Sequence, residues 1–274
     1  MSVETIWEYL ESKGFPVVPR EEDKTVQKVL ESDKMNKAQR SRMAPEFLVS
    51  EKLDGVYSLV TCIPVEVSDD VWEFEVRQWG RSGKAQVNCE ELDCIVNNEL
   101  LHLLQPVYVP TGFILISEIT SADPLAKLSG YLNPNRVNKS DFEPTLFMDN
   151  FHDVIGLGEF IVGRSSVRYY ERRQYLERLL YDSNLIDIDS TSLTFEEAKD
   201  HVKAIWKLGG EGYVLRDPDA PWVAGARNET MIKLKEKLSF DGTVVGMCSG
   251  KEGSKYEFTL GKLLVSFRSF GDPE

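Results

Sequence analysis

One stretch organises this chain: Phe47-Leu48-Val49-Ser50-Glu51-Lys52-Leu53-Asp54-Gly55-Val56-Tyr57-Ser58-Leu59-Val60. Apolar residues flank a charged core in which Lys52 is followed by an acid and then by Gly55. A protonated lysine is a poor nucleophile, but an apolar surround, nearby cations or a metal lower the pKa of the amine enough for attack on an electrophile. An exposed Lys-x-Asp pair before a turn glycine would look the same. The rest of the chain separates the two interpretations.

The composition is that of a globular protein. The 274 residues suit one large domain or two smaller ones, and a hydrophobic content of 42% is ample for a packed core. No apolar run reaches the roughly 18 residues of a membrane helix, and the N-terminus lacks a basic-then-apolar signal pattern. We therefore expect a cytoplasmic protein with no membrane association. Without metal-ligand spacing, its cysteines should be free thiols: Cys62, Cys89, Cys94 and Cys248.

A net charge of −13 argues against a globally basic nucleic-acid binder, although a basic groove on an acidic body stays possible. One basic cluster ends a charged segment and contains Lys34, Lys37, Arg40 and Arg42. Two interpretations of this cluster stay open, a solvated helix face and an arm that contacts phosphates.

The hydrophobic pattern predicts an alternation of helices and strands. Helices are expected over 3–13, 91–104, 167–181 and 195–208, and strands over 47–64, 71–79, 112–119, 146–155, 211–216 and 231–235. After Lys237 the sequence changes to shorter strands, over 242–247 and 256–267.

Several predicted strands and loops carry charged residues. Glu118 lies in an otherwise apolar strand, where an acid is costly unless it is paired, coordinates a metal or binds a ligand. Lys233 and Lys235 alternate along a strand, so two cations face the same way. The loop Gly80-Arg81-Ser82-Gly83-Lys84 has glycines that let its backbone approach a ligand closely. A structural acid and a solvated strand edge are the alternatives for the first two features.

These elements, in this order, resemble the nucleotidyltransferases that form a lysyl-nucleotide intermediate, namely ATP-dependent DNA ligases, RNA ligases and mRNA capping guanylyltransferases. The resemblance covers roughly residues 47–267. Lys52-Leu53-Asp54-Gly55 is similar to the first family motif, with Lys52 as the nucleophile. Arg81-Ser82-Gly83-Lys84 is similar to the Ser-Arg-x-Gly loop, whose arginine helps to hold a nucleic-acid phosphate.

The resemblance also implies a nucleotide and metal site. Glu118 falls at the acid of the Asp-Gly-Glu strand, where the family binds ribose or metal. In the 146–155 strand, Phe151 is the residue we expect to stack on the base, with Phe147 as the alternative.

Further along, Glu211-Gly212-Tyr213-Val214-Leu215-Arg216 is similar to Glu-Gly-x-Val-x-Lys/Arg. This similarity implies that Glu211 is a metal or lysine partner and that Arg216 binds the nucleotide. Lys233-Leu234-Lys235 is similar to the Lys-x-Lys motif that holds the nucleotide phosphate, and we add Glu51 to the predicted nucleotide-binding residues.

Within this group the small bacterial and bacteriophage DNA ligases fit best, because the segment after Lys237 looks like the junction into their oligonucleotide-binding (OB) barrel. The resemblance implies a monomeric enzyme that seals nicks in duplex DNA, with RNA or hybrid substrates possible. It implies ATP as substrate and Mg²⁺ held by Glu118 and Glu211. An RNA ligase, a capping guanylyltransferase and a non-catalytic nucleic-acid-binding relative are the alternatives.

The sequence departs from the family pattern at several positions. Tyr57 stands where an arginine is usual, Ser117 replaces a glycine, and His152 replaces an acid unless Asp153 serves. The barrel needs about five strands, and only the start of one is recognisable, without the basic motif near its end.

We therefore expect an α+β fold, in which residues 1–237 form a nucleotidyltransferase (adenylation) domain of antiparallel sheets flanked by helices. Residues 238–274 should form a partial, apparently truncated OB-like extension.

Overall fold

The structure is a computed structural model that describes residues 3–104, 111–135, 144–181, 183, 185–237, 242–250, 252–253 and 257–266. The described residues fall into two compact units, Met1–Lys235 and Glu236–Glu274. Phe240 and Asp241, and both ends of the strand predicted over 256–267, lie outside the described residues.

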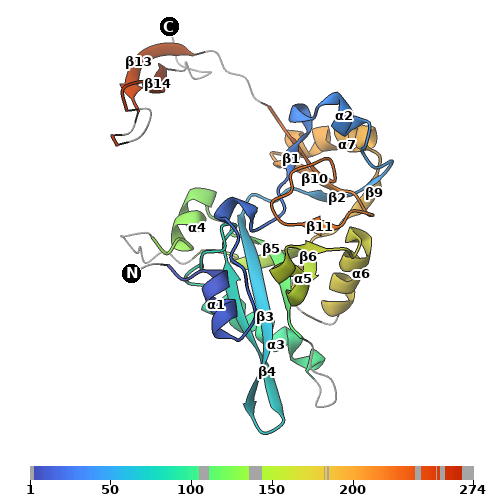
Figure 1. Cartoon of the computed structure of the whole chain (residues 1–274). Helices are drawn as coiled ribbons and strands as arrows, with labels where there is room; N and C mark the ends of the chain where they lie inside the picture. The colour runs from blue at the N-terminus through green and yellow to red at the C-terminus, as the bar shows by residue number, and fades with distance from the viewer. Residues whose placement is uncertain are drawn as a thin grey trace. The chain divides into compact units, whose positions relative to one another are not determined.

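The first sheet of unit 1 is mainly antiparallel and carries a long hairpin (Figure 1). β8 pairs with β6 in parallel. The strand order is β4 (Val71–Trp79), β3 (Val56–Ser68), β5 (Phe113–Thr120), β6 (Met148–Gly156) and β8 (Ile186–Asp187).

The second sheet is assembled from segments that are far apart in the sequence. β1 is parallel to β12, whereas β12, β10, β2 and β9 pair antiparallel to their neighbours. Its order is β1 (Leu30–Glu31), β12 (Met231–Lys235), β10 (Gly212–Arg216), β2 (Phe47–Glu51) and β9 (Thr191–Leu193).

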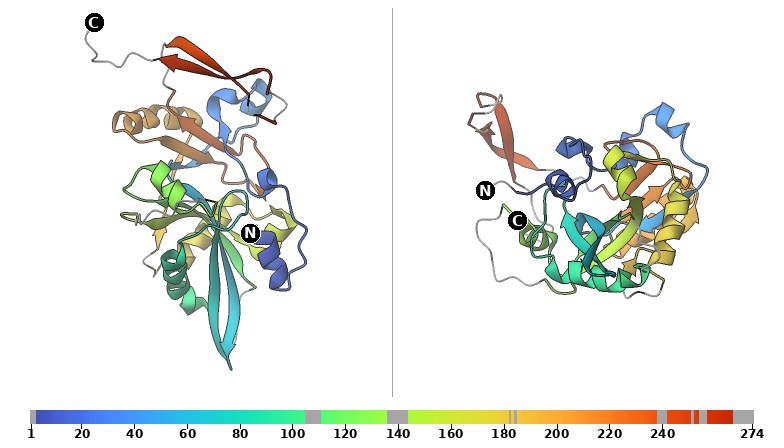
Figure 2. Two further views of the ribbon diagram at one scale, coloured as in Figure 1. Left: turned by 90° about the vertical axis from the view of Figure 1, so that its left-hand side faces the viewer. Right: turned by 60° about the horizontal axis from the view of Figure 1, so that its bottom comes forward.

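Helices cover both sheets (Figures 1 and 2). α3 packs against β4 and α6 against β6, whereas α7 packs against β10 of the second sheet. The predicted helices are confirmed, with shorter ends, and the α+β class is confirmed. The helices are α1 (Ile6–Ser12), α2 (Lys37–Arg40), α3 (Glu90–Leu100), α4 (Leu125–Tyr131), α5 (Leu157–Val162), α6 (Tyr169–Leu179) and α7 (Phe195–Lys207).

Short elements complete unit 1, and a hairpin is described in unit 2. β7 (Arg164–Ser165) pairs with β11 (Trp222–Val223), and 3-10 turns occupy Glu22–Lys24, Ser32–Lys34 and Leu101–Leu103. In unit 2, β13 (Thr243–Ser249) and β14 (Leu260–Ser266) pair antiparallel.

The prediction of a single strand over 47–64 is wrong, because the structure has two separate strands there. β2 ends at Glu51, β3 begins at Val56, and the two strands belong to different sheets. Gly55 makes this crossing possible, since a Cβ at that position would lie 2.4 Å from the carbonyl oxygen of Ile119. Lys52 is therefore located where the chain passes from one sheet to the other.

α1 is anchored to the first sheet by its apolar face. Ile6, Trp7, Tyr9 and Leu10 are all buried against that sheet, and burial of each large apolar side chain contributes about 1.5–3 kcal/mol. Thr5 begins the helix with a reciprocal capping box to Glu8. The N-terminal segment is thus an integral part of unit 1.

Two expectations from composition can be compared with the structure. Across the described part of the chain, every helix is too short or too polar to span a bilayer. All four cysteines lie within the described residues and are free thiols, as expected.

Candidate active site

A cavity lies between the two sheets, and it brings together residues that the sequence analysis took from separate motifs. Of the predicted site residues, those that line it are Glu51, Lys52, Arg81, Glu118 and Arg216. Glu211 reaches it through a direct contact with Lys52, and Lys235 reaches it through its contact with Glu211, as described next.

Lys52 is held at the edge of the second sheet. Its backbone N–H donates to the carbonyl oxygen of Gly212 at 2.8 Å, and its ammonium group contacts the carboxylate of Glu211. Gly212 has φ +141°, and a Cβ there would lie 2.0 Å from the carbonyl oxygen of Leu234. Only glycine lets β10 approach β12 this closely while it holds the lysine.

Glu211 joins two cations. One oxygen contacts Lys52 and the other accepts from Lys235 Nζ at 3.1 Å. Burial raises the pKa of this carboxyl, but the hydrogen bonds from Lys52 and Lys235 outweigh burial, and the pKa is lowered. Glu211 therefore stays ionised and aligns the amine of Lys52.

Glu118 faces the cavity from β5 in a different environment. Burial raises its pKa to about 7, although Arg81 and Lys52 nearby favour the charged form. Within the described ranges, no hydrogen-bond donor reaches its carboxylate. Such a carboxylate is available to a cation that arrives with a ligand.

The acids are too few for a metal cage. Among the residues that the structure describes, no group of three or more His, Cys, Asp or Glu side chains is placed to hold a metal ion. Mg²⁺ commonly uses one or two carboxylates together with phosphate oxygens and waters, and the arrangement of Glu118 and Glu211 fits that mode only.

Arg81 lies over an aromatic ring. Its guanidinium carbon is 4.8 Å from the centroid of Tyr57, the residue that departs from the family's arginine. Burial raises the pKa of Tyr57, so the phenol stays neutral beneath the guanidinium. The tyrosine thus supports a cation at a position where a second arginine would repel it.

His152, the other departure, lies beside Tyr57, with 6.3 Å between the ring centroids. Burial, and then the charge of Arg216, lower the pKa of His152 well below its ordinary value, so the ring is neutral. Asp153 accepts a bidentate pair of hydrogen bonds from Arg172, at 2.8 and 3.0 Å. Asp153 lines the cavity, but both of its carboxylate oxygens already accept hydrogen bonds from Arg172.

The predicted stacking aromatic disagrees with the structure. Phe151 is fully buried in the core of the first sheet, packed with residues of α6, and does not line the cavity. Phe147 packs edge-to-face against Tyr131, with 6.0 Å between centroids, in another cluster. The alternation of β6 explains this result, because Phe151 points to the helix-covered face while its neighbour His152 faces the cavity.

The lysine pair is only partly as predicted. Lys233 and Lys235 share one face of β12, but they bind different acids. Lys233 Nζ lies 3.1 Å from Glu31 of β1, whereas Lys235 binds Glu211. The paired cations are therefore held apart by separate carboxylates.

Arg216 and some unpredicted residues complete the site. Arg216 Nη1 donates to Ser50 Oγ at 3.2 Å, and its guanidinium carbon lies 5.5 Å from the Tyr169 ring centroid. Gln27 and Trp222 also line the cavity and were missed. Gln27 had no local sequence signal, because only pairing of the N-terminal segment with distant strands brings it here.

No protein-family model matches the chain. A probable DNA ligase of Dictyoglomus thermophilum is 33% identical over 109 residues, which cover 37% of this chain and 19% of that protein. DNA ligase 4 of Saccharomyces cerevisiae is 29% identical over 143 residues, covering 49% of this chain and 14% of that protein. The chain thus spans a fifth or less of the curated relatives it matches.

Solved structures match over most of the chain. A protein named Pmar-Lig_Pre has a TM-score of 0.68 at 18% identity, covering 94% of this chain and 56% of that chain. A Lig E DNA ligase, from work on DNA binding with a minimal scaffold, has a TM-score of 0.57 at 15% identity, covering 91% and 81%. The ATP-dependent DNA ligase of bacteriophage T7 in complex with ATP has a TM-score of 0.55 at 15% identity, covering 89% and 81%. The chain therefore has the fold of the ATP-dependent DNA ligases, and the resemblance that its motifs predict is confirmed.

Proposed function

We propose that this protein is an ATP-dependent polynucleotide ligase that seals nicks in duplex DNA through a lysyl-AMP intermediate. The observation that carries the proposal is the chain of contacts from Lys52 through Glu211 to Lys235 at one edge of the cavity, with Glu118 and Arg81 lining the same cavity. A nucleophile, its aligning acid and phosphate-binding cations thus surround one space.

In the first step the amine of Lys52 attacks the α-phosphorus of ATP. A nitrogen–phosphorus bond forms, the bond to the β-phosphate oxygen breaks, and pyrophosphate leaves. The proton that Lys52 loses has an acceptor in contact, the carboxylate of Glu211. Lys235 and Lys233 neutralise phosphate oxygens, because phosphoryl transfer depends mainly on positioning and charge stabilisation.

Glu118 and Glu211 would hold Mg²⁺ at the cavity. Bound there, the ion would polarise a phosphoryl oxygen and offset negative charge. The half-buried carboxylate of Glu118, which no hydrogen-bond donor among the described residues reaches, supports this assignment, since an ionised group in that environment favours an arriving cation.

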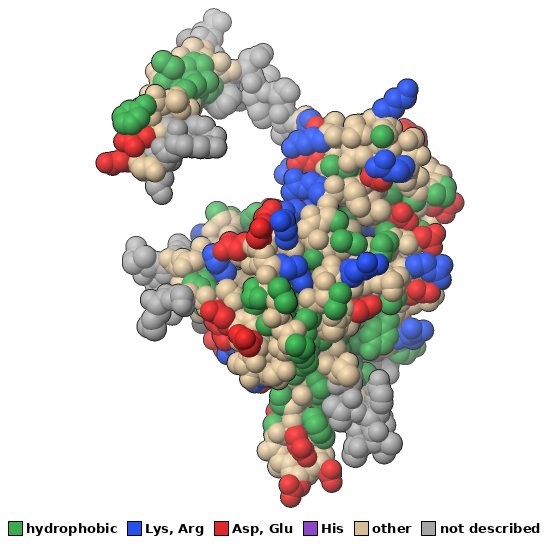
Figure 3. Space-filling model, viewed as in Figure 1, with side chains coloured by type: hydrophobic (Ala, Val, Ile, Leu, Met, Phe, Trp, Pro, Cys, Tyr) green, Lys and Arg blue, Asp and Glu red, His purple; other side chains and the backbone are tan. Residues whose placement is uncertain are grey.

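The later steps pass AMP to the 5′-phosphate of the nick, after which a 3′-hydroxyl displaces AMP. Arg81 is exposed at the cavity and is the residue we assign to the nucleic-acid phosphate. Exposed acids at the tip of the β3–β4 hairpin, Glu66, Asp69 and Asp70, exclude a phosphate contact there (Figure 3). We thus assign the DNA-binding face to the cavity side, and we propose separately, from the family resemblance alone, that the active species is a monomer.

We also assign residues 1–237 to the adenylation domain and 238–274 to an OB-like extension. The boundary between the compact units at Lys235 and the β13–β14 hairpin support this division. Limited proteolysis should cut the intact chain first near that boundary, and first cuts inside residues 111–235 would contradict it.

The test of the function uses ATP labelled at the α-phosphate, followed by a denaturing gel. A labelled protein band that disappears on addition of nicked DNA, with a sealed strand as product, is the expected result. Labelling with GTP in place of ATP would indicate a capping guanylyltransferase. A preference for a ribose 3′ end at the nick would indicate an RNA ligase, and no band under any condition would indicate a non-catalytic binding protein.

A further inference from the structure

The N-terminal arm, defined here as residues 4–31, contacts both sheets that enclose the cavity. Its first half packs on the first sheet through α1, and its last residues form β1 of the second sheet. Gln27 and Val29, between these ends, line the cavity itself. The arm is therefore a segment outside the motifs that touches both walls of the site, and the β8–β9 segment, with Ile188 at the cavity, is another.

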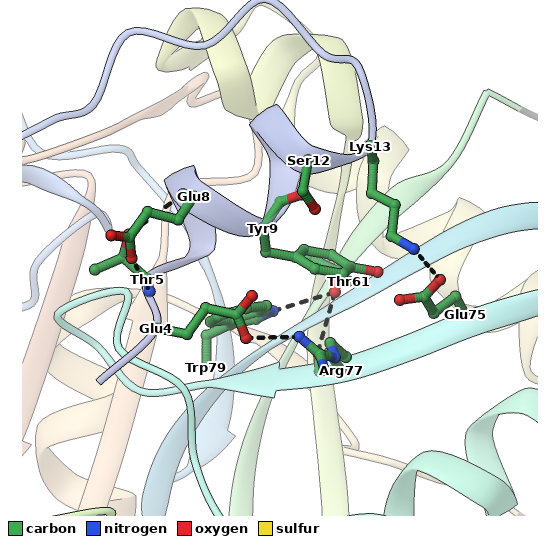
Figure 4. A network of polar contacts seen from close by, with 10 residues as sticks. All are labelled: Glu4, Thr5, Glu8, Tyr9, Ser12, Lys13, Thr61, Glu75, Arg77 and Trp79. Atoms are coloured by element: carbon green, nitrogen blue, oxygen red, sulfur yellow. Dashed lines mark hydrogen bonds and ion pairs between the residues drawn. The ribbon is translucent and has the colours of Figure 1, made fainter. Parts of the chain in front are cut away.

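The beginning of the arm is fixed to β3 and β4 by polar contacts as well as by its apolar face (Figure 4). Lys13 contacts Glu75, and Arg77 Nη1 donates to Glu4 Oε2 at 2.7 Å. Arg77 also lies over the ring of Tyr9, 5.0 Å from its centroid. These contacts tie α1 to a strand that leads directly into the Arg81 loop.

The arm then binds the Arg81 loop, residues 80–84, through backbone hydrogen bonds, and we call this contact the clasp. The Ile6 N–H donates to the carbonyl oxygen of Gly83 at 2.7 Å, and the Ala85 N–H donates to that of Glu4 at 2.9 Å. Gly83 has φ +79°, and a Cβ there would lie 3.1 Å from Ile6 Cγ2 and 3.4 Å from Thr25 Cγ2. The loop is therefore seated closely against the arm, and a Cβ at Gly83 would push against the Ile6 side chain.

The end of the arm is bound to the opposite wall. The Gly225 N–H donates to the carbonyl oxygen of Val26 at 2.9 Å, and the Lys28 N–H to that of Ala226 at 2.7 Å. Glu31 then pairs with Lys233 at 3.1 Å, in the register Glu31 opposite Lys233. One continuous segment thus holds the Arg81 loop at one end and a phosphate-motif lysine at the other.

We propose that the N-terminal arm is a positioning element that sets Arg81 and Lys233 relative to one another across the cavity. Gly83 and Glu31 are its contact points and therefore positioning residues. The inference rests on the proposed ligase function and adds to it that Arg81 and Lys233 are placed by one segment. A nick phosphate and a nucleotide phosphate then meet cations held at a fixed separation.

Gly83→Ala tests the clasp, with Gly14→Ala as the matched control. Both glycines have a left-handed backbone, at φ +79° and +83°, so both alanines carry the same conformational cost. Only the Cβ at Gly83 meets the arm, because nothing lies within 4 Å of a Cβ at Gly14. We expect Gly83→Ala to raise the KM for nicked DNA roughly tenfold to a hundredfold and Gly14→Ala to leave it unchanged. Lysyl-AMP formation should be equal in the two variants.

Two additional variants separate positioning from general damage. In the background of Arg81→Ala, Gly83→Ala should cause no further loss of sealing, because the clasp acts through that arginine. Glu31→Gln should change the KM for ATP several-fold and spare the KM for DNA, since it loosens Lys233 together with the exposed Lys34, the other partner of Glu31, and leaves the Arg81 loop untouched. Glu21→Gln, which breaks an exposed pair with Lys24, is its control.

Different results overturn different statements. A chain that neither forms the adduct nor seals a nick overturns the proposed function, and with it this inference. An active chain in which Gly83→Ala behaves like Gly14→Ala, or adds its full loss to that of Arg81→Ala, overturns the positioning role alone. If Gly83→Ala fails to fold, Glu31→Gln still tests the positioning role, because an unchanged KM for ATP in that variant contradicts the proposal.

Discussion

The two walls of the cavity place their acids in opposite electrostatic environments. On the second sheet, Glu211 binds Lys52 and Lys235, and its pKa is lowered. On the first sheet, Glu118 is half-buried, no hydrogen-bond donor among the described residues reaches its carboxylate, and its pKa is raised to about 7. One wall is organised by ion pairs before any ligand arrives, whereas the other holds a carboxyl whose charged form Arg81 and Lys52 favour without a hydrogen bond.

The two environments have different consequences for stability and for catalysis. Paired groups such as Glu211 align a nucleophile and also stabilise the fold, so their removal lowers both the activity and the free energy of unfolding. An unsatisfied buried carboxylate costs stability and is retained where function needs it. Asp149 on the first sheet is a different case, since burial raises the pKa of its carboxyl to about 6 although Ser117 and Gln78 donate to it.

The largest expected effect is at Lys52 on the paired wall. Lys52→Ala should abolish the labelled lysyl-AMP band, and Lys52→Arg should abolish it too, because a guanidinium is not a usable nucleophile near neutral pH. Labelling with α-labelled ATP on a denaturing gel measures this, with Lys203→Arg on exposed α7 as the control. An adduct that survives in either Lys52 variant would remove Lys52 from the mechanism.

The two acids should respond alike in activity and oppositely in stability. Glu118→Gln and Glu211→Gln should each slow adduct formation roughly 100- to 1,000-fold, and excess Mg²⁺ should not restore it. At pH 8, however, Glu118→Gln should raise the free energy of unfolding by roughly 1–3 kcal/mol, because a buried charge is removed. Glu211→Gln should lower it, because Lys52 and Lys235 lose their partner.

Single-turnover labelling and denaturant unfolding measure these two quantities, and Glu196→Gln, at an exposed pair, serves as control. Stability changes of the same sign in Glu118→Gln and Glu211→Gln would contradict the contrast between the walls.

Asp149 should give the first sheet a pH-dependent stability. Its folded pKa of about 6 lies above the ordinary value of 3.8, so the protonated form is favoured by folding. The corresponding stabilisation is complete below pH 3.8 and is lost as the pH rises through 6, a change of about 3 kcal/mol. The difference between wild type and Asp149→Asn in unfolding free energy should therefore vary between pH 4 and 7. Asp70→Asn, exposed at the hairpin tip, should show no such variation.

The smallest effects are expected at the lysine pair. Lys233→Ala and Lys235→Ala should each raise the KM for ATP about tenfold, since both side chains are partly exposed. Because they bind separate acids, their effects should add in the double variant, whereas Lys235→Ala and Glu211→Gln should not add. Strong coupling between the lysines in that double-mutant cycle would show that they act at one point after all.

Local signals were sufficient for the elements whose residues alternate or repeat clearly. Phe195–Lys207 forms a helix because an apolar stripe follows a Thr194 capping box, and Met231–Lys235 forms a strand because apolar and charged residues alternate. Within residues 47–64, Asp54-Gly55 is a turn signal that marks the break after Lys52. No local pattern shows, however, that the strands on either side belong to different sheets, which is decided by the close approach of Gly55 to Ile119.

The sequence by itself determined the chemical inventory: a lysine in Lys-Leu-Asp-Gly, acids at 118 and 211, a cation at 81 and lysines at 233 and 235. These features are short-range patterns of residue type, which a sequence carries directly. The tertiary structure decided which acid binds which cation, that Phe151 faces the core while His152 faces the cavity, and that the N-terminal arm reaches both walls. Such pairings depend on strand register and on contacts between distant segments, and no local pattern specifies them.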